Sequence, residues 1–193
     1  MTIGIDFDNT IVCYDDAFYQ AARERELVPE TIPHSKNGVR DYLRQQKQET
    51  SWTELQGYIY GQRMNLASAF PGVDRFLQLS QSKNTPIYVI SHKTKHPFLG
   101  PAYDLHAAAM QWFQSQDFPW KPPAFFELTL EEKLQRIRTQ KCAVFIDDLP
   151  EVLQHPQFPD NVRKILFDPH KVHHTELETA SSWDEITQIL YGS

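Results

Sequence analysis

Short apolar runs alternate along the chain with longer stretches in which apolar residues recur three or four positions apart. The short runs predict buried strands at residues 2–7, 86–90, 124–128, 142–146 and 163–167. The longer stretches predict helices at residues 73–81, 104–114, 129–138 and 182–190. Strands that alternate with helices are typical of βαβ units. We therefore expect an α/β fold, a Rossmann-like parallel sheet flanked by helices.

Residues 13–69 contain no convincing strand. Their pattern predicts helices over 12–27 and 38–48 and a third helix that begins at Ser51. These residues read as a small all-helical insertion between the first strand and the return of the chain to the sheet. The predicted domains are an α/β core of residues 1–12 and 70–193 and a helical insertion of residues 13–69.

Three of the predicted helices begin with a capping signal, in which a hydroxyl side chain precedes a glutamate by three positions. The pairs are Ser51 with Glu54, Thr129 with Glu132, and Ser182 with Glu185.

The composition suits one globular domain with a real core. The chain has 193 residues, of which 40% are hydrophobic and 23% charged, and its formal net charge is −6. A mildly acidic surface argues against broad binding of nucleic acid or anionic membranes. Cys13 and Cys142 sit beside apolar runs, which favours core thiols over a disulfide. The sequence shows no signal peptide and no apolar run long enough to span a membrane, so we expect a cytoplasmic protein.

Polar side chains follow three of the predicted strands. Asp6 and Asp8 lie at the end of the first, Ser91 follows PIYVI, and Asp147 and Asp148 follow CAVFI. Ligands of open parallel sheets bind at the carboxyl ends of the strands, so we expect these groups to converge. Four carboxylates at one point repel one another unless a cation lies among them. An all-oxygen set of ligands suits Mg²⁺ best.

A metal ion among carboxylates beside a hydroxyl group is suited to phosphate chemistry. A lysine is still needed for the phosphoryl group. Lys133 lies in the first turn of a predicted helix and could supply it, whereas the alternative, Lys141, directly precedes a strand. Asp6 and Asp8 are two positions apart, so Asp6 can face phosphorus while Asp8 reaches the leaving oxygen as an acid. Thr10 can bond to the turn and fix Asp8.

These residues resemble the motifs of the haloacid dehalogenase superfamily, on its phosphatase branch. The motifs occur in order as IGIDFDNT, IYVIS, a lysine and AVFIDD. The later segments DDLPEVL, ILFDPH and SSWDEI are similar to the branch that contains 5′(3′)-deoxyribonucleotidases. In this family the position of the helical insertion is that of a small cap domain.

The resemblance implies a catalytic cycle. Asp6 would attack phosphorus and become an aspartyl phosphate, while Asp8 would first protonate the leaving group and then activate water. The acid at position 8 implies a phosphatase rather than a dehalogenase. The phosphoryl group would be bound by Thr10, Ser91 and Lys133.

The resemblance also implies a set of metal ligands. Mg²⁺ would be held by Asp6, the backbone carbonyl of Asp8, and Asp147, with Asp148 assisting.

Several polar and aromatic residues have two interpretations. His92, Lys93, Lys95 and His96 could bind a second phosphate or an anionic substrate, or lie in a solvated loop. His170, His173 and His174 are better explained by an exposed loop than by a metal site. Aromatic and basic residues of the insertion could line a substrate lid or pack its own core; they are Trp52, Tyr58, Tyr60 and Arg63.

We therefore expect a Mg²⁺-dependent phosphatase that acts on a small phosphomonoester such as a nucleotide or sugar phosphate. The alternatives are a phosphatase of polynucleotide ends or of proteins, and a non-catalytic phosphate-binding protein on the same scaffold. Neither a nucleic-acid nor a membrane partner is expected. The substrate's identity and the oligomeric state stay open.

Overall fold

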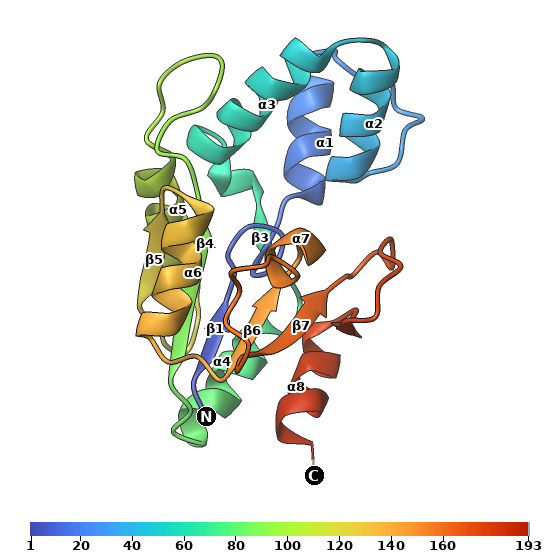
Figure 1. Ribbon diagram of the computed structural model, residues 1–193. Coiled ribbons are helices and arrows are strands. Elements are labelled where there is room, and N and C mark those ends of the chain that lie inside the picture. The colour runs from blue at the N-terminus through green and yellow to red at the C-terminus, as the bar shows by residue number, and fades with distance from the viewer. Residues whose placement is uncertain (193) are drawn as a thin grey trace. The chain divides into compact units, whose positions relative to one another are not determined.

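The computed structural model describes residues 1–192, which form two compact units. The first unit contains Met1–Val12, Ala69–Lys93 and the chain from Gln116 onward. The second contains Cys13–Ser68 and Thr94–Ser115. Figure 1 shows the sheet of the first unit and the blue-to-cyan helices of the second.

A six-stranded parallel sheet forms the first unit. Its strands are β1 (Ile3–Ile5), β4 (Ile87–His92), β5 (Ala124–Glu127), β6 (Val144–Asp147), β7 (Arg163–Phe167) and β8 (Glu178–Ala180). Their order is β5-β4-β1-β6-β7-β8, and every pair of neighbours is parallel. The predicted Rossmann-like α/β fold is confirmed. The sequence pattern did not predict β8, which has only three residues, two of them exposed.

Helices cover both faces of this sheet. They are α4 (Val73–Ser82), α6 (Leu130–Thr139), α7 (Pro150–Leu153) and α8 (Trp183–Tyr191). Successive residues of a strand point to opposite faces. Leu166 of β7 packs in one apolar cluster with Leu134 of α6 and Leu153 of α7. The next residue, Phe167, contacts Trp183 of α8, whose ring also packs against Phe76 of α4. Thus α6 and α7 lie on one face, and α4 and α8 on the other.

Two of the three capping predictions are confirmed. Thr129 and Glu132 form a reciprocal capping box at the start of α6, and the Ser182 hydroxyl accepts a hydrogen bond from the amide of Glu185 at the start of α8. The third is wrong, because α3 (Glu49–Gly61) already begins before Ser51.

The second unit is almost entirely helical. It contains α1 (Asp15–Glu24), α2 (Lys36–Gln45), α3, the 3₁₀ turn η1 (Met64–Leu66) and α5 (Leu105–Ser115). Its range differs from the predicted insertion of residues 13–69 because Thr94–Ser115 also belongs to it. The Trp112 indole of α5 donates a hydrogen bond of 3.0 Å to the Ala67 carbonyl, and α5 also contacts α3. Two strands of two residues each, β2 (Val12–Cys13) and β3 (Ser68–Ala69), form a second small sheet that the sequence pattern did not predict.

Aromatic rings form the core of the helical unit. Phe18 of α1 packs against Trp52 and Tyr60 of α3, with ring centroids 5.0 and 5.7 Å apart. Trp52 is buried. Tyr58 instead lies beside two arginines, under the guanidinium of Arg25 and within 3.0 Å of an Arg63 nitrogen. The packing interpretation therefore holds for Trp52 and Tyr60, while a lid stays a prediction.

Both cysteines are free, with Cys142 buried and Cys13 partly buried, as the sequence predicts. None of the helices within residues 1–192 is both long and apolar enough to cross a membrane.

Candidate active site

The site lies where the direction of chain travel across the sheet reverses. From β1 the chain passes to β4 and β5 on one side, and then to β6, β7 and β8 on the other. Crevices at such a reversal, outside the carboxyl ends of the strands, are where open α/β sheets bind ligands. Ile5 of β1 is paired with both Val89 of β4 and Ile146 of β6, so the residues that follow these three strands start from neighbouring positions.

A buried lysine links the first and last acidic motifs. The Nζ atom of Lys133 donates hydrogen bonds of 2.6 Å to Oδ1 of Asp6 and to Oδ2 of Asp147. The side chains of Lys133, Asp6 and Asp147 are 2%, 6% and 0% exposed. Lys133 stands in the first turn of α6, whose capping box at Thr129 fixes the start of the helix. The predicted convergence of Asp6, Asp147 and Lys133 is thus found in the structure.

Burial and charge shift the ionisation of this group. Burial raises the pKa of the Asp6 carboxyl to about 7; the Lys133 ammonium opposes this, and the charges of Asp147 and Asp8 add to it. Burial alone would lower the pKa of Lys133, but the carboxylates of Asp147 and Asp6 raise it above its usual value. Lys133 therefore stays charged. A cation bound beside Asp6 would favour its ionised form.

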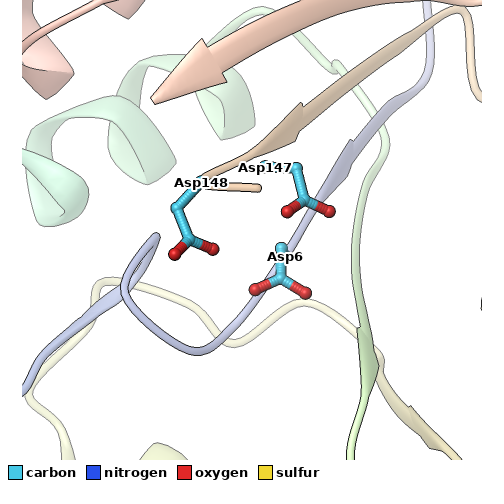
Figure 2. A group of neighbouring side chains, drawn as sticks. All are labelled: Asp6, Asp147 and Asp148. Carbon is cyan, nitrogen blue, oxygen red and sulfur yellow. The ribbon is translucent and has the colours of Figure 1, made fainter. Parts of the chain in front are cut away.

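Three carboxylates of the site could hold a metal ion. One oxygen from each of Asp6, Asp147 and Asp148 lies within 4.8 Å of the others. Figure 2 shows them side by side, with Asp6 on the segment that leaves β1 and the other two at the end of β6. Lys133 bonds one oxygen of Asp6 and one of Asp147, and the second oxygen of Asp147 accepts the Leu149 amide at 3.0 Å.

The charge of the site fits a divalent cation. Together with Asp8 the cluster has four carboxylates, while Lys133 and Lys93 supply two ammonium groups; when all four carboxylates are ionised, an excess of two negative charges is left. One Mg²⁺ would balance this excess, and an all-oxygen set of donors is what Mg²⁺ prefers.

The turn after Asp6 places Asp8. The amides of Ile11 and Val12 both donate to the Phe7 carbonyl, at 3.1 and 3.0 Å, which reverses the chain into β2. Asn9, at the centre of the turn, has a φ of 57°, in the left-handed region that asparagine adopts more readily than most residues. Asp8 is therefore held in a tight turn two residues beyond the buried Asp6.

The predicted role of Thr10 in this turn is wrong. Within residues 1–192 its buried hydroxyl has no hydrogen-bond partner, so it does not bond to the turn. Backbone bonds to Phe7 close the turn instead, and the Thr10 carbonyl accepts a hydrogen bond of 3.0 Å from the Trp183 indole of α8. Binding of a phosphoryl group by Thr10 stays a prediction.

A second buried lysine pairs with Asp8. The Nζ atom of Lys93 donates to both oxygens of the Asp8 carboxylate, at 3.0 and 2.7 Å. The side chain of Lys93 is only 4% exposed, so it does not belong to a solvated loop. The sequence carried a weak signal for this contact, because Lys93 is two positions after Ser91 and strand alternation places both on one side.

The remaining candidates divide between the two ends of the strands. Ser91, at the carboxyl end of β4, is buried. Lys141 is exposed and precedes β6 at the opposite edge of the sheet, so the structure brings Lys133 to the site and leaves Lys141 away from it.

His92, Lys95 and His96 are exposed. The exposed histidines of the later loop, His170, His173 and His174, form no potential metal cluster among the described residues.

Comparison with known proteins gives matches at the level of structure. No protein-family model matches the chain, and no curated protein matches it by sequence. A predicted phosphatase from Clostridium acetobutylicum superimposes with a TM-score of 0.60 at 12% identity, covering 97% of this chain and 96% of its own. A HAD hydrolase from Bacillus subtilis, whose structure is bound to magnesium, gives a TM-score of 0.58 at 14% identity, with 98% of each chain covered.

An L-2-haloacid dehalogenase is similar to the same degree. Its TM-score is 0.57 at 10% identity, with 97% of each chain covered. The likenesses therefore establish that this chain has the fold of HAD-superfamily hydrolases over nearly its whole length, and the side chains of the site must decide its chemistry.

Proposed function

We propose that this protein is a Mg²⁺-dependent phosphatase that hydrolyses a small phosphomonoester through an aspartyl phosphate on Asp6. One observation supports it most strongly. The buried Asp6 carboxylate is hydrogen-bonded to Lys133 and lies in one oxygen cluster with Asp147 and Asp148, at the carboxyl edge of the sheet. The solved structures of similar fold include phosphatases and a magnesium-bound hydrolase, which supports the same class of reaction.

In the proposed first step, one oxygen of Asp6 attacks phosphorus. A bond forms between this oxygen and phosphorus while the bond to the leaving alkoxide breaks. Asp8 gives its proton to the alkoxide, so that a neutral alcohol leaves.

In the second step, water attacks the phosphorus of the aspartyl phosphate and Asp8 accepts a proton from it. The bond between phosphorus and Asp6 breaks, inorganic phosphate leaves, and both aspartates return to their starting states. Ser91, Lys133 and Thr10 are proposed to bind the phosphoryl oxygens during both steps.

The metal ion has a defined place in this proposal. Asp6, Asp147, Asp148 and the backbone carbonyl of Asp8 would hold Mg²⁺, which when bound supplies positive charge beside the phosphoryl oxygens. Lys133 holds two of these carboxylates together, because its ammonium donates a hydrogen bond to each of them.

Asp8 distinguishes this proposal from a dehalogenase on the same fold. A halide leaves as a stable anion and needs no proton, whereas an alkoxide leaves much faster when it is protonated. An acid two residues from the nucleophile is useful only for the second kind of leaving group. The tight turn closed by the Phe7 carbonyl holds Asp8 in this place.

We further propose that the substrate is a nucleotide or a sugar phosphate. The first segment of the helical unit, Cys13–Ser68, follows the first strand, which is the position of a small cap in the family that the motifs resemble, and such a cap would restrict the site to small molecules. A phosphatase that acts on polynucleotide ends or proteins would need an open site.

The test is Mg²⁺-dependent phosphate release from a panel of phosphomonoesters. The panel contains nucleoside 5′- and 3′-monophosphates, sugar phosphates, para-nitrophenyl phosphate, an oligonucleotide with a terminal phosphate and a phosphopeptide. Asp6→Asn serves as the inactive variant and Asp160→Asn, an exposed acid, as its matched control. We expect turnover of small esters by wild type and Asp160→Asn, and none by Asp6→Asn.

Each other outcome has a clear meaning. Absence of turnover by the wild type on every ester would favour the non-catalytic alternative. Equal turnover by Asp6→Asn would contradict the nucleophile. Turnover of the oligonucleotide or phosphopeptide alone would contradict the small substrate.

A further inference from the structure

Lys93 makes a contact that the reaction scheme above does not use. Its ammonium donates to both oxygens of the Asp8 carboxylate, and its side chain is 4% exposed. Removing an ammonium group from water is costly, whereas a lysine in a surface loop pays no such cost. The burial of Lys93 is therefore not explained by a position in a solvated loop.

Both ends of the contact are anchored by the backbone. The amide of Lys93 donates a hydrogen bond of 2.8 Å to the carbonyl of Glu127, which continues the pairing of β4 with β5 one residue beyond the last strand residue, His92. Asp8 stands in the tight turn closed by the Phe7 carbonyl. The lysine thus reaches Asp8 from a fixed strand end, and Asp8 receives it in a fixed turn.

We propose that Lys93 is a positioning residue for Asp8, a role that rests on the proposed function. Two hydrogen bonds to the two oxygens fix the plane of the carboxylate and stop its rotation about χ2. When one oxygen carries the proton for the leaving group, the bond to the other oxygen still fixes that plane. Orientation of a proton donor toward its acceptor can contribute a large share of its catalytic effect.

The residues next to Lys93 in the chain argue against a role for Lys93 in binding a second anion. His92, Lys95 and His96, which could have completed an anion site with Lys93, are exposed, while Lys93 is buried against a carboxylate. A substrate phosphate at Lys93 would have to displace Asp8 from both hydrogen bonds. The two roles make opposite predictions for substrates with different leaving groups.

The test compares two esters of similar shape, para-nitrophenyl phosphate and para-nitrobenzyl phosphate. The nitrophenolate ion is a good leaving group without protonation, whereas the nitrobenzyl alkoxide needs a proton from Asp8. Release of each alcohol is measured by rapid quench in a single turnover with Mg²⁺ and excess enzyme. The variants are Lys93→Met, Asp8→Asn and Asp8→Asn/Lys93→Met, with Lys95→Met as the matched control.

A positioning role has a defined signature. Lys93→Met should slow release of nitrobenzyl alcohol by roughly 10- to 100-fold but release of nitrophenol by less than about 3-fold, since an oriented proton donor contributes about 10²- to 10⁴-fold. The enzyme concentration at half-maximal rate should stay unchanged. The double variant should be no slower than Asp8→Asn, and Lys95→Met should behave as wild type.

Three results would overturn the role of Lys93 while leaving the phosphatase intact. They are equal slowing of both esters in Lys93→Met, weaker binding of both esters, and a double variant slower than Asp8→Asn. Nitrophenol release also reports whether Lys93→Met is folded. If that variant is unstable, alcohol release by Asp8→Asn is compared with release by the double variant, which buries no unpaired charge. A slower double variant then still contradicts the positioning role. No turnover of any ester by wild type would instead overturn the proposed function itself.

Discussion

Lys133 lies between two carboxylates at a place where water is nearly excluded. Its bonds to Asp6 and Asp147 are both 2.6 Å long, and all three side chains are buried. A buried ion pair adds little net stability by itself, but removing one partner leaves the other charge unpaired in a medium that solvates it poorly. At the scale of single residues, this lysine is therefore needed by the fold as well as by the proposed chemistry.

Lys133→Met should lower the free energy of unfolding by about 3 kcal/mol in the absence of Mg²⁺. Added Mg²⁺ should recover part of this loss, because a cation can then compensate Asp6 and Asp147. Urea denaturation with and without Mg²⁺ measures both quantities. Lys141→Met, at an exposed lysine outside the site, should stay within about 0.5 kcal/mol of wild type. A similar stability of the two variants would contradict the account of the buried lysine.

The two lysines of the site differ in how well the sequence predicts them. Lys133 lies in the first helical turn after β5, so the direction of the chain alone places it at the carboxyl ends of the strands. Lys141 lies just before β6, so the same argument places it at the amino ends. Lys93 gives only a weak signal, its place two positions after Ser91, because the strand pattern ends at Ile90 in a run of lysines and histidines. Its burial depends on β4 continuing to His92 and on the bond from Lys93 to Glu127. These are tertiary contacts that local periodicity does not encode.

At the scale of elements, β1 carries the nucleophile and must fit closely between its neighbours. A Cβ atom at Gly4 would lie 2.5 Å from the Phe145 ring of β6 and 3.0 Å from the Cys142 sulfur. Glycine at this position lets the Phe145 ring pack over the strand. The centroid of this ring lies 5.5 Å from Nζ of Lys133.

Gly4→Ala should therefore lower the free energy of unfolding by about 2 kcal/mol through overpacking. In Gly4→Ala/Phe145→Leu the smaller side chain relieves the clash, so the double variant should lose less than the two single variants together. Chemical denaturation of all four proteins gives the coupling. Additive losses would show that the ring does not limit the space at Gly4.

The elements that the sequence predicted well are those with a long pattern or a capping pair. The strands from RKILF and CAVFI and the helix after Thr129 are examples, within one or two residues at their ends. The strands β2, β3 and β8 have two or three residues, too few for any periodicity. Ser51 has a capping pattern, but the amide of Trp52 already donates to the Gln48 carbonyl, so the first helical turn of α3 is formed before Ser51.

At the scale of the whole molecule, the sequence predicts a sheet domain and a helical insertion but not their full membership. Residues 104–114 have the pattern of a crossover helix that would pack on the sheet. The structure instead joins α5 to the helical unit, where Trp112 bonds to Ala67 and Tyr103 bonds to Gln62 at 2.9 Å. A helical pattern shows that one face is buried but does not identify its partner.

Mg²⁺ should stabilise the whole protein through this one site. At about 100 times its Kd, the ion should raise the free energy of unfolding by about 2.7 kcal/mol, because it binds only the folded chain. Asp147→Asn should lose most of this increment, whereas Asp160→Asn should keep it. The increment is measured within each variant by thermal denaturation with and without Mg²⁺, so the cost of the substitution itself cancels. Equal increments in both variants would place the ion elsewhere.

The central claim is that Asp6 carries the phosphoryl group during the reaction. The most direct measurement uses Asp8→Asn, which should accept a phosphoryl group from para-nitrophenyl phosphate but hydrolyse it slowly. After acid quench in the presence of Mg²⁺, peptide mapping by mass spectrometry should find one phosphoryl group on the peptide that contains Asp6. Hydroxylamine should remove it, as it does for acyl phosphates, and Asp6→Asn/Asp8→Asn should carry none. A phosphoryl group on another residue, or phosphate release by wild type with no phosphorylated peptide in Asp8→Asn, would contradict the account.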